Sequence, residues 1–208
     1  MKTSRLCQSA CSLVFFAMTA AGCSSSTPGF EPVNLNSSDI AEKIVLACDT
    51  DGDGMLTAEE LAKVPGMTEA FHVYDTNSDG KVTADDIAAR IDIWNTMPRG
   101  VMPVRCQVLV NGRPIEGALV RLVPEKFFAD SIQPAEGMTD AEGFTSPARG
   151  MSATAEPAES GAYIGIYRVE ITHPSKKIPP RYNTQTKLGL EVAPDSRTAS
   201  QTVFHLKG

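Results

Sequence analysis

The chain has 208 residues, of which 25 are acidic and 19 basic, so its formal net charge is −6 at pH 7. Residues 1–22 contribute Lys2 and Arg5 and no acid, which leaves 17 basic and 25 acidic residues, or −8, beyond them. Residues 49–60 and 75–86 together carry nine acids and one lysine, also −8, so the rest of the chain is balanced. This distribution argues against a surface built for nucleic acid, and we expect no nucleic-acid partner.

The N-terminal segment has the pattern of an export signal. A basic start, with Lys2 and Arg5, precedes an apolar run at residues 13–18 that is too short to span a membrane. We therefore predict a signal peptide over residues 1–22.

Residues 20–23, Ala-Ala-Gly-Cys, resemble the lipobox of bacterial lipoproteins. The resemblance implies a lipoprotein signal peptide, lipidation of Cys23 and membrane anchoring in the exported bacterial cell envelope, at the outer membrane or the periplasmic face. An ordinary signal peptide cleaved nearby, with Cys23 incidental, is the alternative. Residues 23–36 are expected to form a flexible tether.

Two copies of a twelve-residue pattern, at residues 49–60 and 75–86, predict metal binding. Each has oxygen-bearing side chains at positions 1, 3 and 5, glycine at position 6 and a carboxylate at position 12. Ca²⁺ needs about six to eight oxygens, which alternate positions can supply; glycine permits the sharp turn, and position 7 ligates through its carbonyl. The candidate ligands are Asp49, Asp51, Asp53, Met55 and Glu60 in the first loop, and Asp75, Asn77, Asp79, Lys81 and Asp86 in the second.

The segments that flank each loop support this interpretation, because apolar residues recur there at helical spacing. Leu56 and Val82, at position 8 of their loops, are expected to form a short strand contact. Thr57 and Glu60 have the spacing of a helix-capping box. Residues 37–96 therefore resemble a pair of EF-hands, which implies two calcium sites. Polar turns that bind no metal are the alternative for both loops.

The two loops differ at position 12. Glu60 is long enough to offer both carboxylate oxygens, whereas Asp86 is one methylene shorter, so we predict that the second site binds Ca²⁺ more weakly and tolerates Mg²⁺ better. Lys81 is expected to matter little, because position 7 uses its carbonyl. Pro65 and Gly66 are expected to end the helix after the first loop within about one turn, which favours a compact pair held folded by calcium over a sensor.

The spacing of apolar residues changes beyond residues 96–100, which mark a domain boundary. Alternation with a period of two predicts a strand at residues 104–110, and Asn111-Gly112 predicts a tight turn. Further strands are expected at residues 118–123, 164–171, 188–192 and 202–206. Together these strands suit a small antiparallel sandwich.

Three short patterns within residues 103–208 resemble the carboxypeptidase regulatory-like domain. They are Val-x-Val-Asn-Gly-x-Pro-Ile from residue 108, Thr-Asp-x-x-Gly-Phe from residue 139 and Tyr-x-Val-x-Ile from residue 167. The resemblance implies a transthyretin-like β-sandwich that serves as a non-catalytic accessory or adhesive module of exported proteins. The expected fold class is therefore α+β with several domains, a helical EF-hand pair followed by an antiparallel β-sandwich.

Two cysteines remain for the folded part of the chain, because Cys7 and Cys11 leave with the signal peptide and Cys23 is expected to be acylated. Cys48 and Cys106 can form a disulfide in an oxidising compartment or remain as two buried thiols, and both alternatives are open.

No catalytic motif is apparent in the sequence. His72, His173 and His205 lack the spacing of a zinc protease, and no Gly-x-Ser-x-Gly occurs. We therefore expect that the protein is not an enzyme.

The leading interpretation is a calcium-binding, lipid-anchored protein of the cell envelope whose β-sandwich interacts with an envelope protein or glycan. Lys176, Lys177 and Arg181, close in sequence to Tyr182, suit an anionic glycan, and a solvated polar loop is the simpler alternative. A dockerin-like plug and a transthyretin-like carrier of small ligands are the other candidates. Dockerins lack full entering helices, and both entering helices are expected here.

Overall fold

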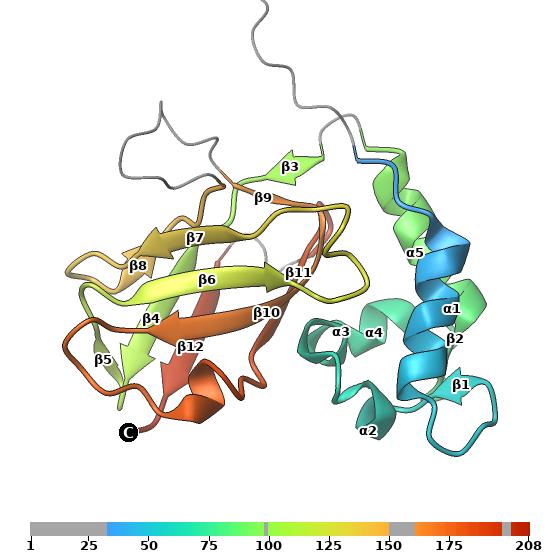
Figure 1. The fold of residues 1–208 in the computed structure, drawn as a ribbon, viewed down its shortest axis with the longest axis horizontal. Helices are drawn as coiled ribbons and strands as arrows, with labels where there is room; N and C mark the ends of the chain where they lie inside the picture. The colour runs from blue at the N-terminus through green and yellow to red at the C-terminus, as the bar shows by residue number, and fades with distance from the viewer. Residues whose placement is uncertain (1–32, 98–99, 150–160, 197–200) are drawn as a thin grey trace, which may run out of the picture.

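The computed structural model of this protein describes residues 33–97, 100–149, 161–196 and 201–208, which form a helical half followed by a β-rich half (Figure 1). The predicted signal peptide, Cys23 and most of the predicted tether lie outside the described residues. Among the residues that are described, no helix is long and apolar enough to cross a membrane.

Two helices of 12 residues each, α1 (Ser37–Cys48) and α5 (Ala84–Asn95), pack against each other in the helical half. Strands β1 (Met55–Leu56) and β2 (Val82–Thr83) pair antiparallel within this half. Leu56 lies opposite Val82, and both side chains are fully buried, so the predicted strand contact between the two loops is confirmed.

The segment between the loops is more broken than the sequence predicts. Helix α2 (Ala58–Leu61) is a single turn, as expected, but Pro65 then begins a new helix, α3 (Pro65–Glu69). The prediction of a full helix entering the second loop was wrong, because the helix is interrupted at Ala70 and completed by α4 (Phe71–Tyr74). Proline suits the first position of α3, where its missing N–H leaves no hydrogen bond unmade.

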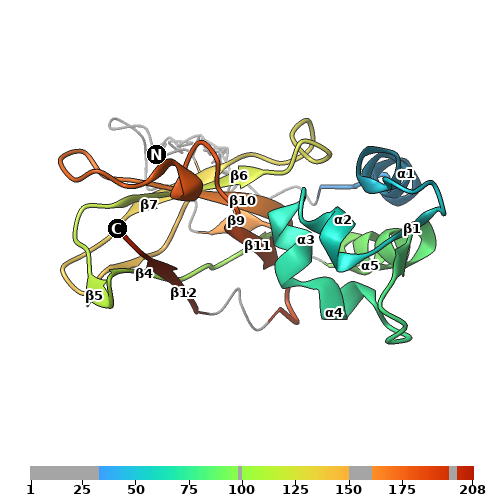
Figure 2. The same ribbon diagram turned by 90° about the horizontal axis from the view of Figure 1, so that it is seen from below.

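The β-rich half contains two sheets, which Figures 1 and 2 show as separate layers. The first has the order β11-β10-β6-β7, and all its neighbouring strands are antiparallel. Its strands are β6 (Leu119–Pro124), β7 (Ala135–Met138), β10 (Gly165–Thr172) and β11 (Gly189–Val192). The second sheet comprises β4 (Cys106–Val110), β5 (Arg113–Pro114), β8 (Phe144–Thr145) and β12 (Thr202–Leu206). Outside the two sheets lie a strand pair, β3 (Val101–Met102) with β9 (Ala162–Tyr163), and a 3-10 helix, η1 (Pro180–Tyr182).

The second sheet is mixed rather than antiparallel, which corrects the prediction. Strand β12 runs parallel to β4, with Thr202 opposite Cys106 and Leu206 opposite Val110, whereas β5 and β8 pair with β4 antiparallel. Alternating apolar residues identify a half-buried strand but carry no information about its direction. The positions of these strands were therefore predictable, and the direction of β12 was not.

Helix α3 joins the two halves by packing against β10 and β11. A Cβ at Gly189 would overlap the backbone of Pro65 and Gly66, and a Cβ at Gly66 would lie 3.0 Å from the carbonyl oxygen of Tyr167. Glycine therefore allows direct contact between the backbones of α3 and the sheet. The buried residues of both halves form one hydrophobic core.

A buried ionic cluster lies between the same two halves. The Arg90 guanidinium, on α5, donates to both carboxylate oxygens of Glu191 on β11 at 3.1 and 3.0 Å, and to both of Asp195 at 2.7 and 2.8 Å. The Tyr74 hydroxyl, at the end of α4, donates to Glu191 Oε1 at 3.1 Å. The Arg90 and Glu191 side chains are only 5% and 1% exposed. The helices before and after the second loop are thus both bonded to the β-rich half.

Cys48 and Cys106 are buried free thiols, so of the two open alternatives the disulfide is not formed. Cys48 ends α1, whereas Cys106 begins β4 in the second sheet. Burial raises the pKa of both thiols, that of Cys106 to about 12. Neither is therefore a ready nucleophile or metal ligand at neutral pH.

Candidate metal centre

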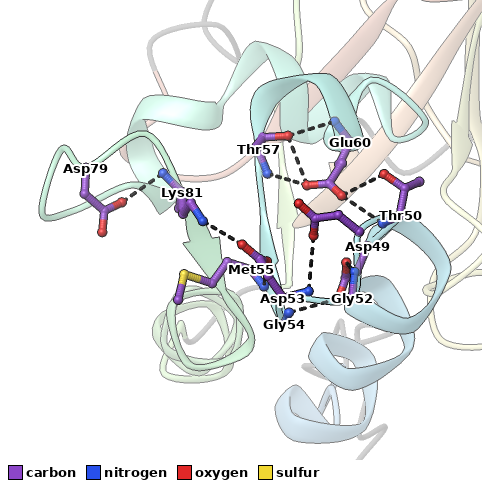
Figure 3. A network of polar contacts seen from close by, with 11 residues as sticks. Asp49, Thr50, Gly52, Asp53, Gly54, Met55, Thr57, Glu60, Asp79 and Lys81 are labelled. Atoms are coloured by element: carbon purple, nitrogen blue, oxygen red, sulfur yellow. Dashed lines mark hydrogen bonds and ion pairs between the residues drawn. The ribbon is translucent and has the colours of Figure 1, made fainter.

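The first loop brings its three leading carboxylates together. One oxygen from each of Asp49, Asp51 and Asp53 lies within 4.8 Å of the other two. Backbone N–H groups hold the Asp49 carboxylate in place: Gly52 donates to Oδ1 at 2.7 Å and Gly54 to Oδ2 at 3.0 Å (Figure 3). The oxygens of alternate residues therefore converge on one small region at the end of α1, as the spacing predicts.

The twelfth residue of the first loop, Glu60, closes the loop. Its Oε1 accepts hydrogen bonds from the N–H and hydroxyl of Thr50 at 2.8 and 2.9 Å, and its Oε2 accepts from the N–H and hydroxyl of Thr57 at 2.9 and 3.0 Å (Figure 3). These bonds to Thr57 and Thr50 lower the pKa of Glu60 to about 2. The carboxylate is therefore ionised at any physiological pH. To ligate a metal through both oxygens, it has to exchange part of these hydrogen bonds.

The second loop repeats the arrangement with fewer charges. Asp75 accepts from the N–H groups of Asp79 at 3.0 Å and Gly80 at 2.9 Å, and the Asn77 amide donates to Asp79 Oδ2 at 2.9 Å. At position 12, Asp86 Oδ2 accepts from the N–H and hydroxyl of Thr83 at 2.9 and 2.6 Å.

Among the described residues, Asp86 has no counterpart to the bonds between Glu60 and Thr50. This difference follows from the missing methylene, because the shorter Asp86 side chain reaches only the near threonine. The carboxylate at position 12 therefore makes fewer hydrogen bonds across the second loop than across the first.

Lys81 links the two loops through a contact that its position in the sequence did not indicate. Its ammonium lies 2.6 Å from Asp53 Oδ2, so a side chain of the second loop pairs with a candidate ligand of the first (Figure 3). The pair lowers the pKa of Asp53 and raises that of Lys81. Any cation that binds the first loop through Asp53 Oδ2 therefore competes with a positive charge already in contact with it.

The seventh residues lie at the start of the short strands: Met55 is the first residue of β1, and Lys81 directly precedes β2. The Met55 N–H donates to Asp53 Oδ1 at 2.8 Å, and the Lys81 N–H donates to Asp79 Oδ1 at 2.8 Å. Met55 then pairs with Thr83 across the two strands. The two loops are therefore matched at this position as well, and they are joined rather than independent.

The tight turns of the two loops differ in one residue. Gly52 and Gly54 of the first loop have φ values of +79° and +78°, and Gly80 of the second has +82°. Ser78, the counterpart of Gly52, has φ +59°, a region that a residue with a Cβ adopts at a cost of about 1–2 kcal/mol. The second loop therefore carries backbone strain that the first loop lacks.

The donor set of the first loop fits a hard cation. The gathered side chains offer carboxylate oxygens alone, which is the chemistry that Ca²⁺ and Mg²⁺ require, whereas zinc prefers nitrogen and sulfur. Asp49, Asp51, Asp53 and Glu60, with the Met55 carbonyl, would hold the ion in the first loop. Asp75, Asn77, Asp79 and Asp86, with the Lys81 carbonyl, would do so in the second. A bound ion would offset the mutual repulsion of the carboxylates and link α1 to the start of α2.

Several residues that shape this centre were not found by sequence reasoning. Thr50 shares the Glu60 carboxylate with Thr57, Ser78 carries the strained turn, and the Lys81 ammonium reaches the opposite loop. Of these, only Ser78 has a signal in the sequence, because it stands where the first loop has glycine.

The other candidates from the sequence are used in local structure. His173 Nδ1 accepts from the N–H groups of Ser175 and Lys176 at 3.1 and 3.0 Å, so Nε2 carries the proton that it donates to the Glu116 carbonyl at 2.9 Å. Arg181 donates to the Lys207 carbonyl and lies over the Tyr182 ring, 5.0 Å from its centroid. All three basic residues expected near a glycan, Lys176, Lys177 and Arg181, are exposed.

Comparison with known proteins bears on the same stretch of the chain. A search of curated proteins finds no match. Residues 47–65 and 68–89 match the family model described as EF hand. These two segments contain both loops, helices α2 and α4, the end of α1 and the first half of α5. This stretch is therefore similar to EF hands, and with the aspartate cluster of the first loop it indicates calcium binding.

Proposed function

We propose that this protein is a calcium-binding component of the bacterial cell envelope, held at a membrane by a lipid on Cys23. The observation that carries the proposal is the convergence of Asp49, Asp51 and Asp53 within 4.8 Å in a segment that matches the EF hand. In this proposal calcium neutralises the loop carboxylates and links α1 to the start of α2. The protein is proposed to catalyse no reaction.

The role of calcium in this proposal is structural rather than that of a switch. A sensor needs helices that swing apart and uncover an apolar groove. Here α2 is a single turn, α3 is wedged against β10 and β11, and the buried residues of the two halves share one core. These contacts support a pair of loops that calcium holds folded while the helices stay in place.

The envelope location rests on the lipobox-like residues 20–23 and the short apolar run before them. A lipid at Cys23 would attach the chain without a membrane-spanning segment. The β-rich half is proposed to be a non-catalytic sandwich that contacts an envelope protein or glycan. The exposed Lys176 and Lys177 support contact with an anionic polymer.

Calorimetric titration of the soluble 24–208 fragment with Ca²⁺ and with Mg²⁺ tests the calcium proposal. We expect two calcium ions per chain, with the tighter site lost in an Asp51→Ala variant. A chelator-treated fragment that gives no heat with calcium and no rise in melting temperature would contradict the proposal. Radiolabelled palmitate incorporation into the full chain, and its loss in Cys23→Ala, tests the anchor separately.

A further inference from the structure

A polar cavity of about 220 Å³ lies where the helical half meets the β-rich half. Its walls come from the end of α1 with Cys48, from Lys63 and Val64 before α3, and from Glu125 and Arg168 of the β-rich half. The volume is several times the roughly 30 Å³ that a water molecule occupies in the liquid. The cavity is therefore large enough for a small ion, and the calcium loops do not line it.

The charges around this cavity are unbalanced. Lys63, Lys126 and Arg168 line it with three positive charges, against the single carboxyl of Glu125. The Lys63 ammonium is held at the cavity by the Cys48 carbonyl, at 3.3 Å. The lining as a whole therefore favours an anion.

Glu125 is a buried carboxyl whose hydrogen bonding is incomplete. The residue is 4% exposed, and its backbone is fixed because its N–H donates to the Ile166 carbonyl at 2.9 Å. Within the described part of the chain, Glu125 Oε1 has no hydrogen-bond partner. Buried carboxyl oxygens rarely remain without one, so this atom marks a place for a donor.

A donor without a partner lies beside this acceptor. Arg168 Nε, also buried and without a hydrogen-bond partner among the described residues, is 3.7 Å from Glu125 Oε2, too far for a hydrogen bond. The cavity wall thus presents an unused acceptor and an unused donor together, within a positive surrounding. A group that fits must accept from cations and also donate to a carboxylate.

We propose that this cavity binds a small oxyanion that retains an acidic proton, of the hydrogen phosphate class. Lys63, Lys126 and Arg168 hold its unprotonated oxygens, and its remaining hydroxyl donates to Glu125.

The carboxyl makes the site selective as well as polar. Sulfate has the shape and charge of hydrogen phosphate but no proton at neutral pH, so it leaves Glu125 unpaired and repels its ionised form. A site built to accept a hydrogen bond from a ligand rejects an analogue that lacks the donor. Discrimination between these two ions is therefore the signature of the proposed site.

The test is calorimetric titration of the full chain with inorganic phosphate and, separately, with sulfate, with calcium at two equivalents to avoid precipitation. The titration is run at pH 8, where Glu125, with its pKa of about 7, is mostly ionised and phosphate still carries one proton. We expect phosphate to bind saturably, and sulfate to bind at least about tenfold more weakly than phosphate. Arg168→Met should weaken phosphate binding roughly tenfold, because it removes a charged donor. The matched control, Arg113→Met, removes an exposed arginine outside the cavity and should leave binding unchanged.

Glu125→Gln is the sharpest variant, because its amide can donate to an oxyanion where the carboxylate cannot. We expect it to bind sulfate as well as it binds phosphate, with its melting temperature showing that it is folded. Three outcomes overturn the proposal: no heat with phosphate, equal binding of phosphate and sulfate by the parent, or unchanged selectivity in a folded Glu125→Gln.

Discussion

At the scale of single residues, Lys81 shows how one side chain can tune the opposite loop. Its ammonium lies 2.6 Å from Asp53 Oδ2, and both side chains are partly exposed, Lys81 at 39% and Asp53 at 35%. A pair of this kind is weak and screened by salt, yet it opposes every cation that needs the same oxygen. The Lys81 ammonium therefore competes with any metal ion that binds the first loop.

Replacing Lys81 with methionine is expected to raise the calcium affinity of the first loop about two- to fivefold, because the competing charge is removed while the backbone carbonyl remains. Calorimetry at low and high salt measures the effect, which should shrink as salt rises. Lys187→Met removes an equal charge from an exposed position outside the loops and should have little effect. Equal affinity in the Lys81→Met variant and the parent would exclude the competition.

Ser78 is the second residue whose effect can be measured. Ser78→Gly is expected to raise the free energy of unfolding by about 0.5–1 kcal/mol, since glycine relieves the strained φ of +59° at some cost in unfolded-chain entropy. Urea denaturation of the calcium-loaded protein measures the change. The reciprocal Gly52→Ser variant of the first loop should lose a similar amount, and a stabilised Gly52→Ser would contradict this account.

At the scale of elements, the start of the exit helix decides how strongly each loop is closed. Asp86→Glu restores the longer side chain at position 12, which can reach across the loop as Glu60 does. We expect the calcium affinity of the second loop to rise and its preference for Ca²⁺ over Mg²⁺ to sharpen. Competitive titration of the two ions measures both effects. If the affinities do not change, side-chain length is not the cause of the difference between the loops.

The connection after β6 contains a titrating group with a predictable effect on stability. Burial raises the pKa of Glu125 from 4.5 to about 7, although Arg168 and Lys126 oppose the shift. The folded protein therefore holds this proton more firmly than the unfolded chain. The contribution of Glu125 to the free energy of unfolding is fully present below pH 4.5 and is lost as the pH rises through 7.

We expect the parent to lose about 3 kcal/mol from this source between pH 4.5 and pH 8. Glu125→Gln, which cannot ionise, should lose less over the same range. Urea denaturation at the two pH values measures the difference, with Glu142→Gln as a control for one exposed acid. Equal slopes for the Glu125→Gln variant and the parent would show that Glu125 does not titrate in this window.

Elements that show a periodic pattern within one segment were predictable from the sequence. The strand predicted at residues 202–206 matches β12, and that at 188–192 begins one residue before β11, because alternation with a period of two is visible within one segment. The helix before Pro65 ends within one turn, as expected, but Pro65 also begins α3, which its sequence position did not reveal. The convergence of the first-loop aspartates was predictable because all three lie within five residues.

At the scale of the whole molecule, the features that the sequence did not reveal join distant residues. Lys81 meets Asp53 only because β1 and β2 pair, and Arg90 of α5 meets Glu191 only because the helical half packs on the β-rich half. No local pattern marks Arg90, which resembles an ordinary exposed arginine of a helix until its partners are known. The contact between the two halves was therefore beyond prediction from one sequence.

Arg90→Met is expected to destabilise the protein by about 3–5 kcal/mol, because it leaves the buried Glu191 without its partner. The parent should melt in one cooperative transition whose midpoint rises with calcium. In the variant the two halves should melt separately, and calcium should raise the midpoint of only one of the two transitions. Differential scanning calorimetry with and without calcium shows the difference. A second change, Glu191→Gln, should recover part of the loss, and Arg113→Met is the matched control. Full stability in Arg90→Met would mean that the ionic cluster does not join the halves.

The parallel pairing of β12 with β4 governs when the molecule can assemble during synthesis. Residue 106 finds its partner on β12 only when residue 202 has been made, and Arg90 can bond to Glu191 only when residue 191 has been made. A nascent chain therefore cannot complete the ionic contact between its halves before residue 195 has been made, or the second sheet before residue 206 has been made. Premature termination anywhere between these partners should yield an aggregation-prone fragment rather than a smaller folded protein.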